Sequence, residues 1–97
     1  MPKVHLKGQS CSGHGCFPPR SNIQGSPNVF VNGTAVHRQF DAWSLHCCPK
    51  PPSCHGGILA KGSSSVYANN KQLGRQFDPV SCGSIAIGGS SNVFAGG

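Results

Sequence analysis

Glutamate is absent from this 97-residue chain, and its acidic residues are limited to Asp41 and Asp78. Hydrolytic enzymes commonly need a carboxylate or a histidine as general base beside an activated water. Both aspartates stand at equivalent positions of an internal repeat, which indicates structural roles, such as pairing with a repeat arginine. The chain also has no G-x-S-x-G motif and no phosphate-binding loop. We therefore expect that the protein is not an enzyme.

Long apolar runs are missing as well. The N-terminal residues MPKVHLKGQ lack the apolar core of a signal peptide, and no stretch approaches transmembrane length. No window shows apolar residues at helical spacing over ten or more positions. Together with 14 Gly and 8 Pro, this pattern predicts almost no helix and many short strands.

The absence of a signal peptide predicts synthesis in a reducing cytoplasm, where cysteines stay reduced. Cys11–Cys16 and Cys48–Cys54 are each spaced to close small loops, whereas vicinal Cys47-Cys48 would form a strained disulfide. Because cysteines occur together with five His, the sequence favours a metal site. A secreted disulfide scaffold is the alternative. The six cysteines are Cys11, Cys16, Cys47, Cys48, Cys54 and Cys82.

The excess of positive charge has no matching nucleic-acid motif. Eight Lys and Arg against two Asp give a formal net charge of +6, but the basic residues are scattered singly. Aromatic residues do not interleave with them as a stacking platform requires, and C-x-x-C pairs at finger spacing are absent. We expect no nucleic-acid partner, and keep a small zinc-containing nucleic-acid-binding domain as an alternative.

What the chain does contain is a repeat. The stretch Gly25 to Asp41 returns as Gly62 to Asp78, shifted by 37 positions at both ends (62 − 25 and 78 − 41), and its opening returns as Gly89 to Phe94. Each full copy predicts a hairpin, since Asn32-Gly33 and Asn69-Asn70 suit a two-residue turn with positive φ. The third copy supplies only the outgoing strand. Recurrence at this spacing predicts one domain over residues 1–97 with three units about a pseudo-threefold axis.

The segments outside the repeats are expected to be less regular. Pro2 to Leu6 reads as a short β-like lead with His5 facing solvent, and Gly8 to Ile23 as an irregular loop. Ala42 to Gly57, rich in Pro, Gly and Cys, is predicted to be a second long loop. His37 lies inside a repeat strand and is expected to be structural, like His5.

These features together resemble the PAAR-repeat family. The block that gives the family its name corresponds to Ala35-Val36-His37-Arg38 and Gln72-Leu73-Gly74-Arg75, both divergent but both keeping the arginine. Phe40-Asp41 and Phe77-Asp78 replace the usual Gly-Asp that follows. The resemblance implies an all-β fold: a small pointed cone of short strands, with one structural metal ion, usually zinc, near the vertex.

The resemblance also implies a function. Family members are structural tips that sharpen and cap the trimeric β-helical spike of a contractile injection machine, one chain per trimer, and help it pierce a cell envelope. Since the sequence ends soon after its third strand, it looks most like the standalone tip on the central tail spike of T-even-type phages, within the virion baseplate. The tip of a type VI secretion spike is the alternative.

Convergence of three units at a vertex selects candidate metal ligands from the loops that precede each repeat strand. The third loop offers Cys82, seven positions before Gly89, and His55 is equally placed before Gly62. The first loop offers Cys11, His14 and Cys16, of which His14 lies between two glycines. For the fourth ligand His46 competes with Cys47, Cys48 and Cys54. The three-His, one-Cys habit of the family favours the set His14, His46, His55 and Cys82.

The same geometry predicts an apolar base that contacts the spike. The repeated Val-Phe strands would supply it, and their alternation leaves open which face points outward. The residues expected at this partner surface are Val29, Val31, Val66, Val93 and Phe94.

Overall fold

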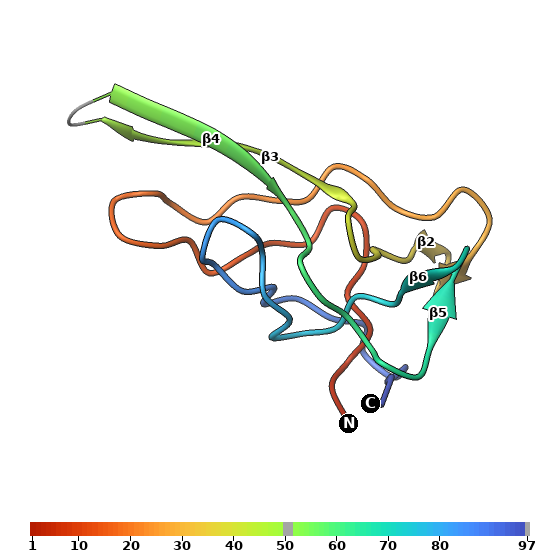
Figure 1. The fold of residues 1–97 in the computed structure, drawn as a ribbon. Coiled ribbons are helices and arrows are strands. Elements are labelled where there is room, and N and C mark those ends of the chain that lie inside the picture. The colour runs from red at the N-terminus through yellow and green to blue at the C-terminus, as the bar shows by residue number, and fades with distance from the viewer. Residues whose placement is uncertain (50–51, 97) are drawn as a thin grey trace.

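The computed structural model describes residues 1–49 and 52–96, and its regular elements there are all strands. Three two-stranded antiparallel sheets make up a body that is 40 Å long and tapers from a broad end to a point (Figure 1). No helix in the described residues is long and apolar enough to cross a membrane. The strands are β1 (Phe30–Val31), β2 (Thr34–Ala35), β3 (Ala42–Pro49), β4 (Pro52–Ile58), β5 (Tyr67–Ala68) and β6 (Lys71–Gln72).

The two predicted hairpins are β1–β2 and β5–β6, at the broad end. Phe30 pairs with Ala35, and Tyr67 pairs with Gln72 at the equivalent position of the second repeat. The turn residues between the strands have the positive φ angles that the Asn-Gly and Asn-Asn pairs predict. Beyond these short ladders, the repeats continue as isolated bridges such as Arg38 with Leu73.

A closed ring of backbone hydrogen bonds joins three segments at the centre of the broad half. The amide of His37 donates to the carbonyl of His5 (3.0 Å), and the amide of Gly74 donates to that of His37 (2.8 Å). The amide of His5 closes the ring on the carbonyl of Gly74 (2.9 Å). His37 and Gly74 occupy the same position of the two repeats, so His5 marks the third. The ring confirms the predicted pseudo-threefold axis.

The N-terminal segment therefore completes the third repeat. The amide of Val4 donates to the carbonyl of Val93, as Val36 does to Val29 and Leu73 does to Val66. The expectation that residues 2–6 form a lead with His5 in solvent is wrong, because this segment is the returning strand of Val93 and Phe94. As a consequence, His5 is fully buried.

The end of each repeat is fixed by one polar side chain that caps its own backbone. Asp41 accepts hydrogen bonds from the amide and the guanidinium of Arg38, and Asp78 does the same for Arg75. In the third repeat Gln9 accepts the bond from the amide of Leu6 (2.8 Å). A leucine and a neutral amide thus replace the ion pair that the other two repeats form as Arg38–Asp41 and Arg75–Asp78.

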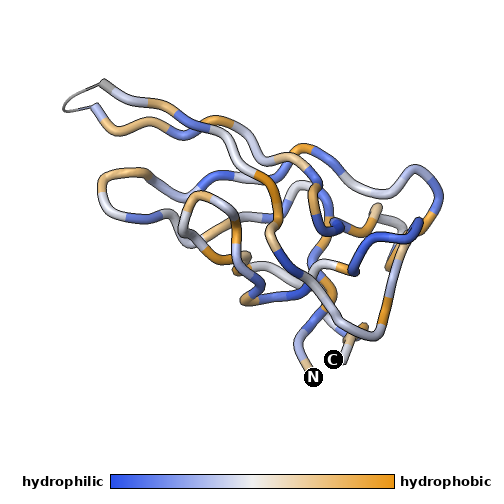
Figure 2. The backbone as a smooth tube through the Cα atoms, in the orientation of Figure 1, coloured by the Kyte–Doolittle hydropathy of each residue, from blue (hydrophilic) through white to orange (hydrophobic). Residues whose placement is uncertain are grey.

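Two apolar clusters lie one after the other along the long axis of the molecule. The cluster in the broad half contains Val4, Leu6, Val36, Ala68, Leu73 and Ala95. The cluster in the tapered half contains Cys11, Trp43, Leu59, Val80 and Ala86. Apolar stretches along the chain are short and interrupted by polar ones throughout (Figure 2), so each cluster collects single residues from distant segments.

The segment 42–57, predicted to be a loop, is instead mostly the long hairpin β3–β4 that runs to the tapered end (Figure 1). Its Pro, Gly and Cys content conceals a period-two pattern, since Trp43, His46 and Cys48 are buried while Leu45 and Cys47 are exposed. A register shift between Trp43 and His46 puts both on the inner face.

Candidate metal centre

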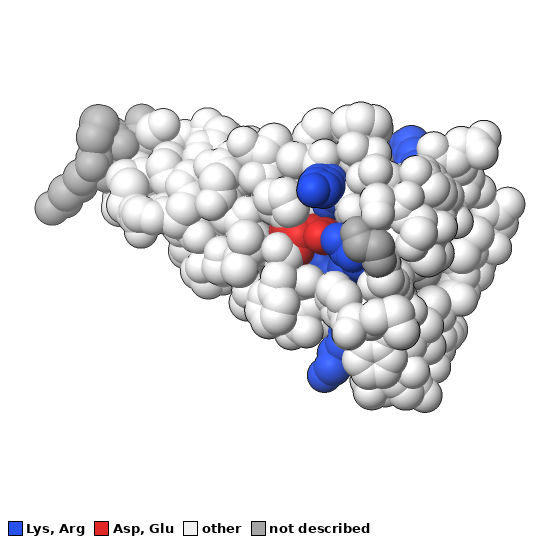
Figure 3. Space-filling model, turned by 60° about the horizontal axis from the view of Figure 1, so that its bottom comes forward, with Lys and Arg blue, Asp and Glu red and all other residues white. Residues whose placement is uncertain are grey.

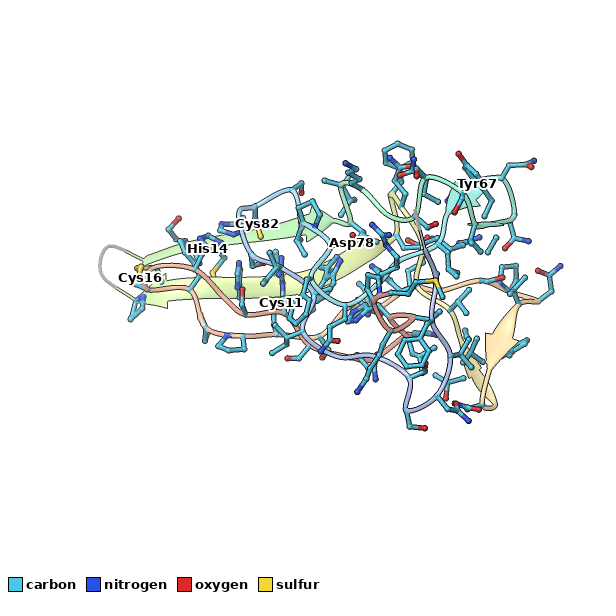
Figure 4. The ribbon with its side chains drawn as sticks, turned by 90° about the horizontal axis from the view of Figure 1, so that it is seen from below. Cys11, His14, Cys16, Tyr67, Asp78 and Cys82 are labelled. Atoms are coloured by element: carbon cyan, nitrogen blue, oxygen red, sulfur yellow. A yellow bond between two sulfur atoms is a disulfide. The ribbon has the colours of Figure 1, made fainter. Side chains whose placement is uncertain are left out.

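Three histidines and one cysteine come together near the tapered end, and they are the four ligands that the sequence and the family resemblance selected. His46 comes from β3 and His55 from β4, while His14 and Cys82 come from two separate loops (Figure 4). One ligand atom of each residue lies within 4.8 Å of the others. This group could hold a metal ion.

The contacts among the three imidazoles suit a shared cation. Nε2 of His55 lies 3.1 Å from Nε2 of His14 and 2.7 Å from Nε2 of His46. A single proton on His55 can satisfy only one of these two contacts. Nδ1 of His46 donates to the carbonyl of Pro18 (2.8 Å), which leaves its Nε2 lone pair free for a metal. In a tetrahedral zinc site, metal–nitrogen bonds of about 2.0–2.1 Å put neighbouring nitrogens about 3.3 Å apart, which is close to the separation of His14 and His55 and longer than that of His46 and His55.

Repeat symmetry explains how separate segments converge. His14 lies five positions after Gln9, and His46 lies five positions after Asp41, the equivalent residue (14 − 9 and 46 − 41). His55 and Cys82 share the second equivalent position, seven before a repeat glycine. The group therefore consists of two symmetry-related pairs. Counting forward from the capping residue selects His46 over the competing cysteines once Gln9 is known to be equivalent to Asp41.

Local backbone brings His14 inward. In a tight turn, the amide of His14 donates to the carbonyl of Phe17 and the amide of Phe17 donates to the carbonyl of His14. The flanking Gly13 and Gly15 both have positive φ. A Cβ at Gly13 would lie 2.6 Å from the carbonyl oxygen of Phe17, so the turn has no room for a side chain there. The Phe17 ring packs against His55, with ring centroids 4.3 Å apart.

Arg20 is a buried residue at the site that sequence reasoning did not single out. Its guanidinium donates to the sulfur of Cys82 (3.4 Å) and to the sulfur of Cys11 (3.0 Å). It lies 5.1 Å from the centre of the Trp43 ring, and its Nε donates to the carbonyl of Ser44. Asp41 and Asp78 pair with other cations. The buried charge of Arg20 therefore has the two cysteine sulfurs, rather than a carboxylate, as its polarisable acceptors.

These neighbours act on the thiol of Cys82. Desolvation would raise its pKa, but hydrogen bonds from Ser84 and Arg20 together with the positive charge of Arg20 outweigh that effect, and the pKa is lowered. The pKa of His55 is also lowered, first by desolvation and then by the neighbouring His46, His14 and Arg20. Both shifts favour the deprotonated form, which is the form that binds a metal.

The cysteines that competed for the fourth ligand position are paired instead. Cys16 forms a disulfide with Cys48, and Cys47 forms one with Cys54 across the β3–β4 ladder. The expectation that these four cysteines are reduced is therefore wrong in this structure, and so are the pairs Cys11–Cys16 and Cys48–Cys54. The alternation of β3 points Cys47 and Cys48 to opposite faces, so each finds a different partner. Among the described residues, Cys11 and Cys82 are the free thiols.

His5 and His37, expected to be structural, lie on the pseudo-threefold axis and are fully buried. Their rings contact each other and both contact Trp43, with centroids 5.2 to 5.5 Å apart. Desolvation lowers the pKa of His37 to about 4 and also lowers that of His5. Both therefore serve as neutral core residues.

The predicted partner surface is divided by the strand alternation. Val29 and Val66 are exposed, whereas Val31 and Val93 are half-buried and both pack against the core of the broad half, so these two do not belong to an exposed base. Each repeat also carries one exposed aromatic residue at the same position, and these three residues are here called the basal aromatics. They are Phe30 (57% exposed), Tyr67 (55%) and Phe94 (48%).

A family model described as PAAR motif matches residues 21–88 of the chain. The chain is 35% identical over 79 residues to the NAD(P)(+) glycohydrolase toxin Tse6 of Pseudomonas aeruginosa. It is also 35% identical over 79 residues to the (p)ppApp synthetase toxin Tas1 from another strain of that species. Both matches cover 77% of this chain but 18% of the relative, so the chain spans about a fifth of their length.

Proposed function

The chain belongs to the PAAR-motif family, and we propose that it is the structural tip of a contractile injection machine, seated on a trimeric β-helical spike. The observation that supports this role best is the closed backbone ring of His5, His37 and Gly74. A single chain with threefold backbone symmetry can offer equivalent contacts to three identical subunits. One chain would therefore cap one trimer.

The broad end is the surface proposed to meet the spike. The basal aromatics stand at equivalent positions around the pseudo-threefold axis, and Tyr67 lies at the broad end (Figure 4). Exposed apolar side chains gathered in one place are typical of a partner surface. Among the described residues on the face in Figure 3, the charged side chains gather towards the broad half, away from the tapered end opposite. This end is proposed to meet the target envelope first, in transient contact.

The metal at the candidate centre is proposed to be one zinc ion held by His14, His46, His55 and Cys82. Four nitrogen and sulfur ligands from the protein are typical of structural zinc sites, in which no coordination position is left for a substrate. The ion would supply cross-linking between two loops and the hairpin β3–β4. In keeping with the absence of glutamate, we propose that these residues have no catalytic role.

The relatives favour a secretion apparatus over a phage tail. Both are named as toxins, and the matched region makes up 18% of each. A spike that delivers toxins fits a type VI secretion system, in which the tip would be exported with the spike. The phage-tail tip, located in the virion, is the competing possibility. A nucleic-acid-binding role has less support, because Lys and Arg form no continuous stripe on the face in Figure 3.

Binding to purified spike fragments tests the role. The chain should co-purify with a trimeric β-helical spike fragment at one chain per trimer, and a fragment from a type VI system should bind more tightly than one from a contractile phage. Replacing the three basal aromatics by Ser should abolish binding. The matched control is Phe40→Asn with Phe77→Asn, which removes two equally exposed aromatics outside the hairpins. A 3:3 complex, or equal binding by both variants, would contradict the proposed docking.

A further inference from the structure

Each histidine of the candidate metal centre lies next to a disulfide. Cys16 is two residues after His14, Cys47 and Cys48 directly follow His46, and Cys54 directly precedes His55. The Cys16–Cys48 bond joins the loop of His14 to β3, whereas Cys47–Cys54 joins β3 to β4. The two bonds therefore cross-link the three segments that carry the nitrogen ligands.

The two disulfides differ in what else holds their segments together. His46 and His55 are direct partners in the β3–β4 ladder, so backbone pairing fixes their separation without the Cys47–Cys54 bond. His14 has no such ladder to β3. Its turn is closed internally by hydrogen bonds with Phe17. The turn meets β3 through non-covalent contacts of His14, Phe17 and Pro18 with His46, and the Cys16–Cys48 bond is its covalent link to that strand.

We propose that the Cys16–Cys48 disulfide positions His14 for metal binding, so that the redox state of this bond sets the metal affinity of the centre. The inference rests on the proposed metal site. When the bond is open, the turn around His14 must lose conformational freedom each time the metal binds, and this loss weakens binding. When it is closed, that ordering has already taken place.

Formation of the Cys16–Cys48 bond requires a two-electron oxidant, and a small-molecule disulfide can supply it. The thiols of Cys16 and Cys48 would exchange with a small-molecule disulfide such as oxidised glutathione. One sulfur–sulfur bond forms in the protein and one breaks in the small molecule, which takes up two electrons and two protons and leaves as two thiols. Because linkage is reciprocal, a metal that binds the oxidised form more tightly must also make the disulfide harder to reduce by the same factor.

The first test compares metal affinity between two double variants. Cys16→Ser with Cys48→Ser should weaken binding of Zn²⁺, or of the spectroscopic probe Co²⁺, at least tenfold in competition with a chromophoric chelator. Cys47→Ser with Cys54→Ser is the matched control and should change the affinity less than threefold. The Co²⁺ absorption spectrum of the first variant should also change, because one imidazole is less available, while the spectrum of the control stays the same.

A second measurement needs no substitution of the disulfides. In the intact protein, saturating Zn²⁺ should lower the midpoint potential of Cys16–Cys48 by about 30 mV for a tenfold coupling. The bond is identified by differential alkylation and mass spectrometry. In a His14→Ala chain the shift should disappear, which assigns the coupling to His14 rather than to general stability.

The outcomes separate the two proposals. Equal metal affinity in the wild type and both double variants, with no shift of the potential, would overturn the inference and leave the metal site intact. Failure of the wild type to bind one equivalent of Zn²⁺ or Co²⁺ in either redox state would overturn the metal site and this inference together. An affinity loss in the control as large as in the first variant would also overturn the specific role of Cys16–Cys48.

Discussion

The broad and tapered halves of this small protein are stabilised by different means. In the broad half, three segments repeat the same backbone hydrogen bonds around one axis, and the side chains of the core are small and aliphatic. In the tapered half, the three loops differ in length and sequence, and disulfides together with a His/Cys group join them. Where the backbone repeats, symmetry supplies the contacts. Where the backbone does not repeat, disulfides and the His/Cys group join the segments instead.

The tapered half also has fewer apolar residues with which to form a core. Its cluster contains the large side chain of Trp43 and the buried Cys11, and it lies beside the charged Arg20. A domain of this size buries a limited apolar surface, and small domains commonly add cross-links for that reason. The comparison predicts that substitutions in the broad half act through packing and ion pairs. The tapered half should respond to reductant and chelator instead.

The largest effect is expected for Asp41→Ala. The carboxylate of Asp41 is fully buried and accepts two hydrogen bonds from the guanidinium of Arg38 and one from its amide. Removing it leaves a buried cation without its partner, which typically costs about 3–5 kcal/mol of unfolding free energy. Urea denaturation would measure this loss.

The third repeat provides the control for Asp41→Ala. It uses Leu6 and Gln9 where the others use Arg and Asp. The double variant Arg38→Leu with Asp41→Gln should therefore recover most of the lost stability. If Asp41→Ala loses less than 1 kcal/mol, the buried pair does not hold the broad half as described.

The next prediction concerns how the free energy of unfolding depends on pH through His5 and His37, the two buried histidines of the central ring. Burial lowers the pKa of His37 from 6.5 to about 4, so below pH 6.5 the unfolded chain binds more protons than the folded one. The stability is therefore complete above pH 6.5 and decreases as the pH falls towards 4, by about 3 kcal/mol for His37. His5 adds to the loss in the same direction. Urea denaturation at a series of pH values would measure the slope, and His37→Leu should remove its share. A pH-independent free energy between 7 and 4 would contradict this prediction.

A smaller loss is expected for Gly74→Ala. A Cβ at Gly74 would lie 2.6 Å from the carbonyl oxygen of His37, which belongs to the central ring. Overpacking of this kind typically costs about 1–3 kcal/mol. The control is Gly56→Ala in β4, where the nearest atom would lie 3.6 Å away. Thermal unfolding should separate the two variants, and equal melting temperatures would show that the ring can widen.

The smallest effect on stability is expected for the basal aromatics. Phe30 is 57% exposed, so Phe30→Ser should change the unfolding free energy by less than about 0.5 kcal/mol. The same holds for Phe94→Ser. A loss above 1 kcal/mol in denaturant titrations would place these rings in the core of the isolated protein, and would weaken their assignment as a partner surface.

Sequence reasoning identified the features that repeat. Turn residues such as Asn32-Gly33 predicted the hairpins, and the repeat predicted the pseudo-threefold axis. The spacing of His55 and Cys82 predicted half of the metal group, because residues at the same offset in each repeat occupy equivalent positions in the fold. The resemblance to the family supplied His46. The third repeat was recognised only in part, although Val4-His5 matches Val36-His37, because its two halves lie at opposite ends of the sequence.

The features that do not repeat could not be found in this way. The strands β3 and β4 contain the Pro, Gly and Cys residues that usually mark a loop, and tertiary contacts override that local preference. The two disulfides could not be predicted, because a sequence does not contain the distances between cysteines. The expected reducing conditions favoured free thiols instead. Arg20 has no equivalent at a recognisable offset, so its contact with Cys82 depends on the fold alone.

The division of the third repeat also determines when the fold can be completed. The amide of Val4 donates to the carbonyl of Val93 across 89 positions (93 − 4), and Lys3 pairs with Phe94. During synthesis, residues 3 and 4 must therefore stay unpaired with their partner strand until residues 93 and 94 have been made. Contacts this distant in sequence slow folding, because chain entropy is lost before any contact forms. The threefold arrangement of the broad half is thus completed only after both full repeats have been synthesised.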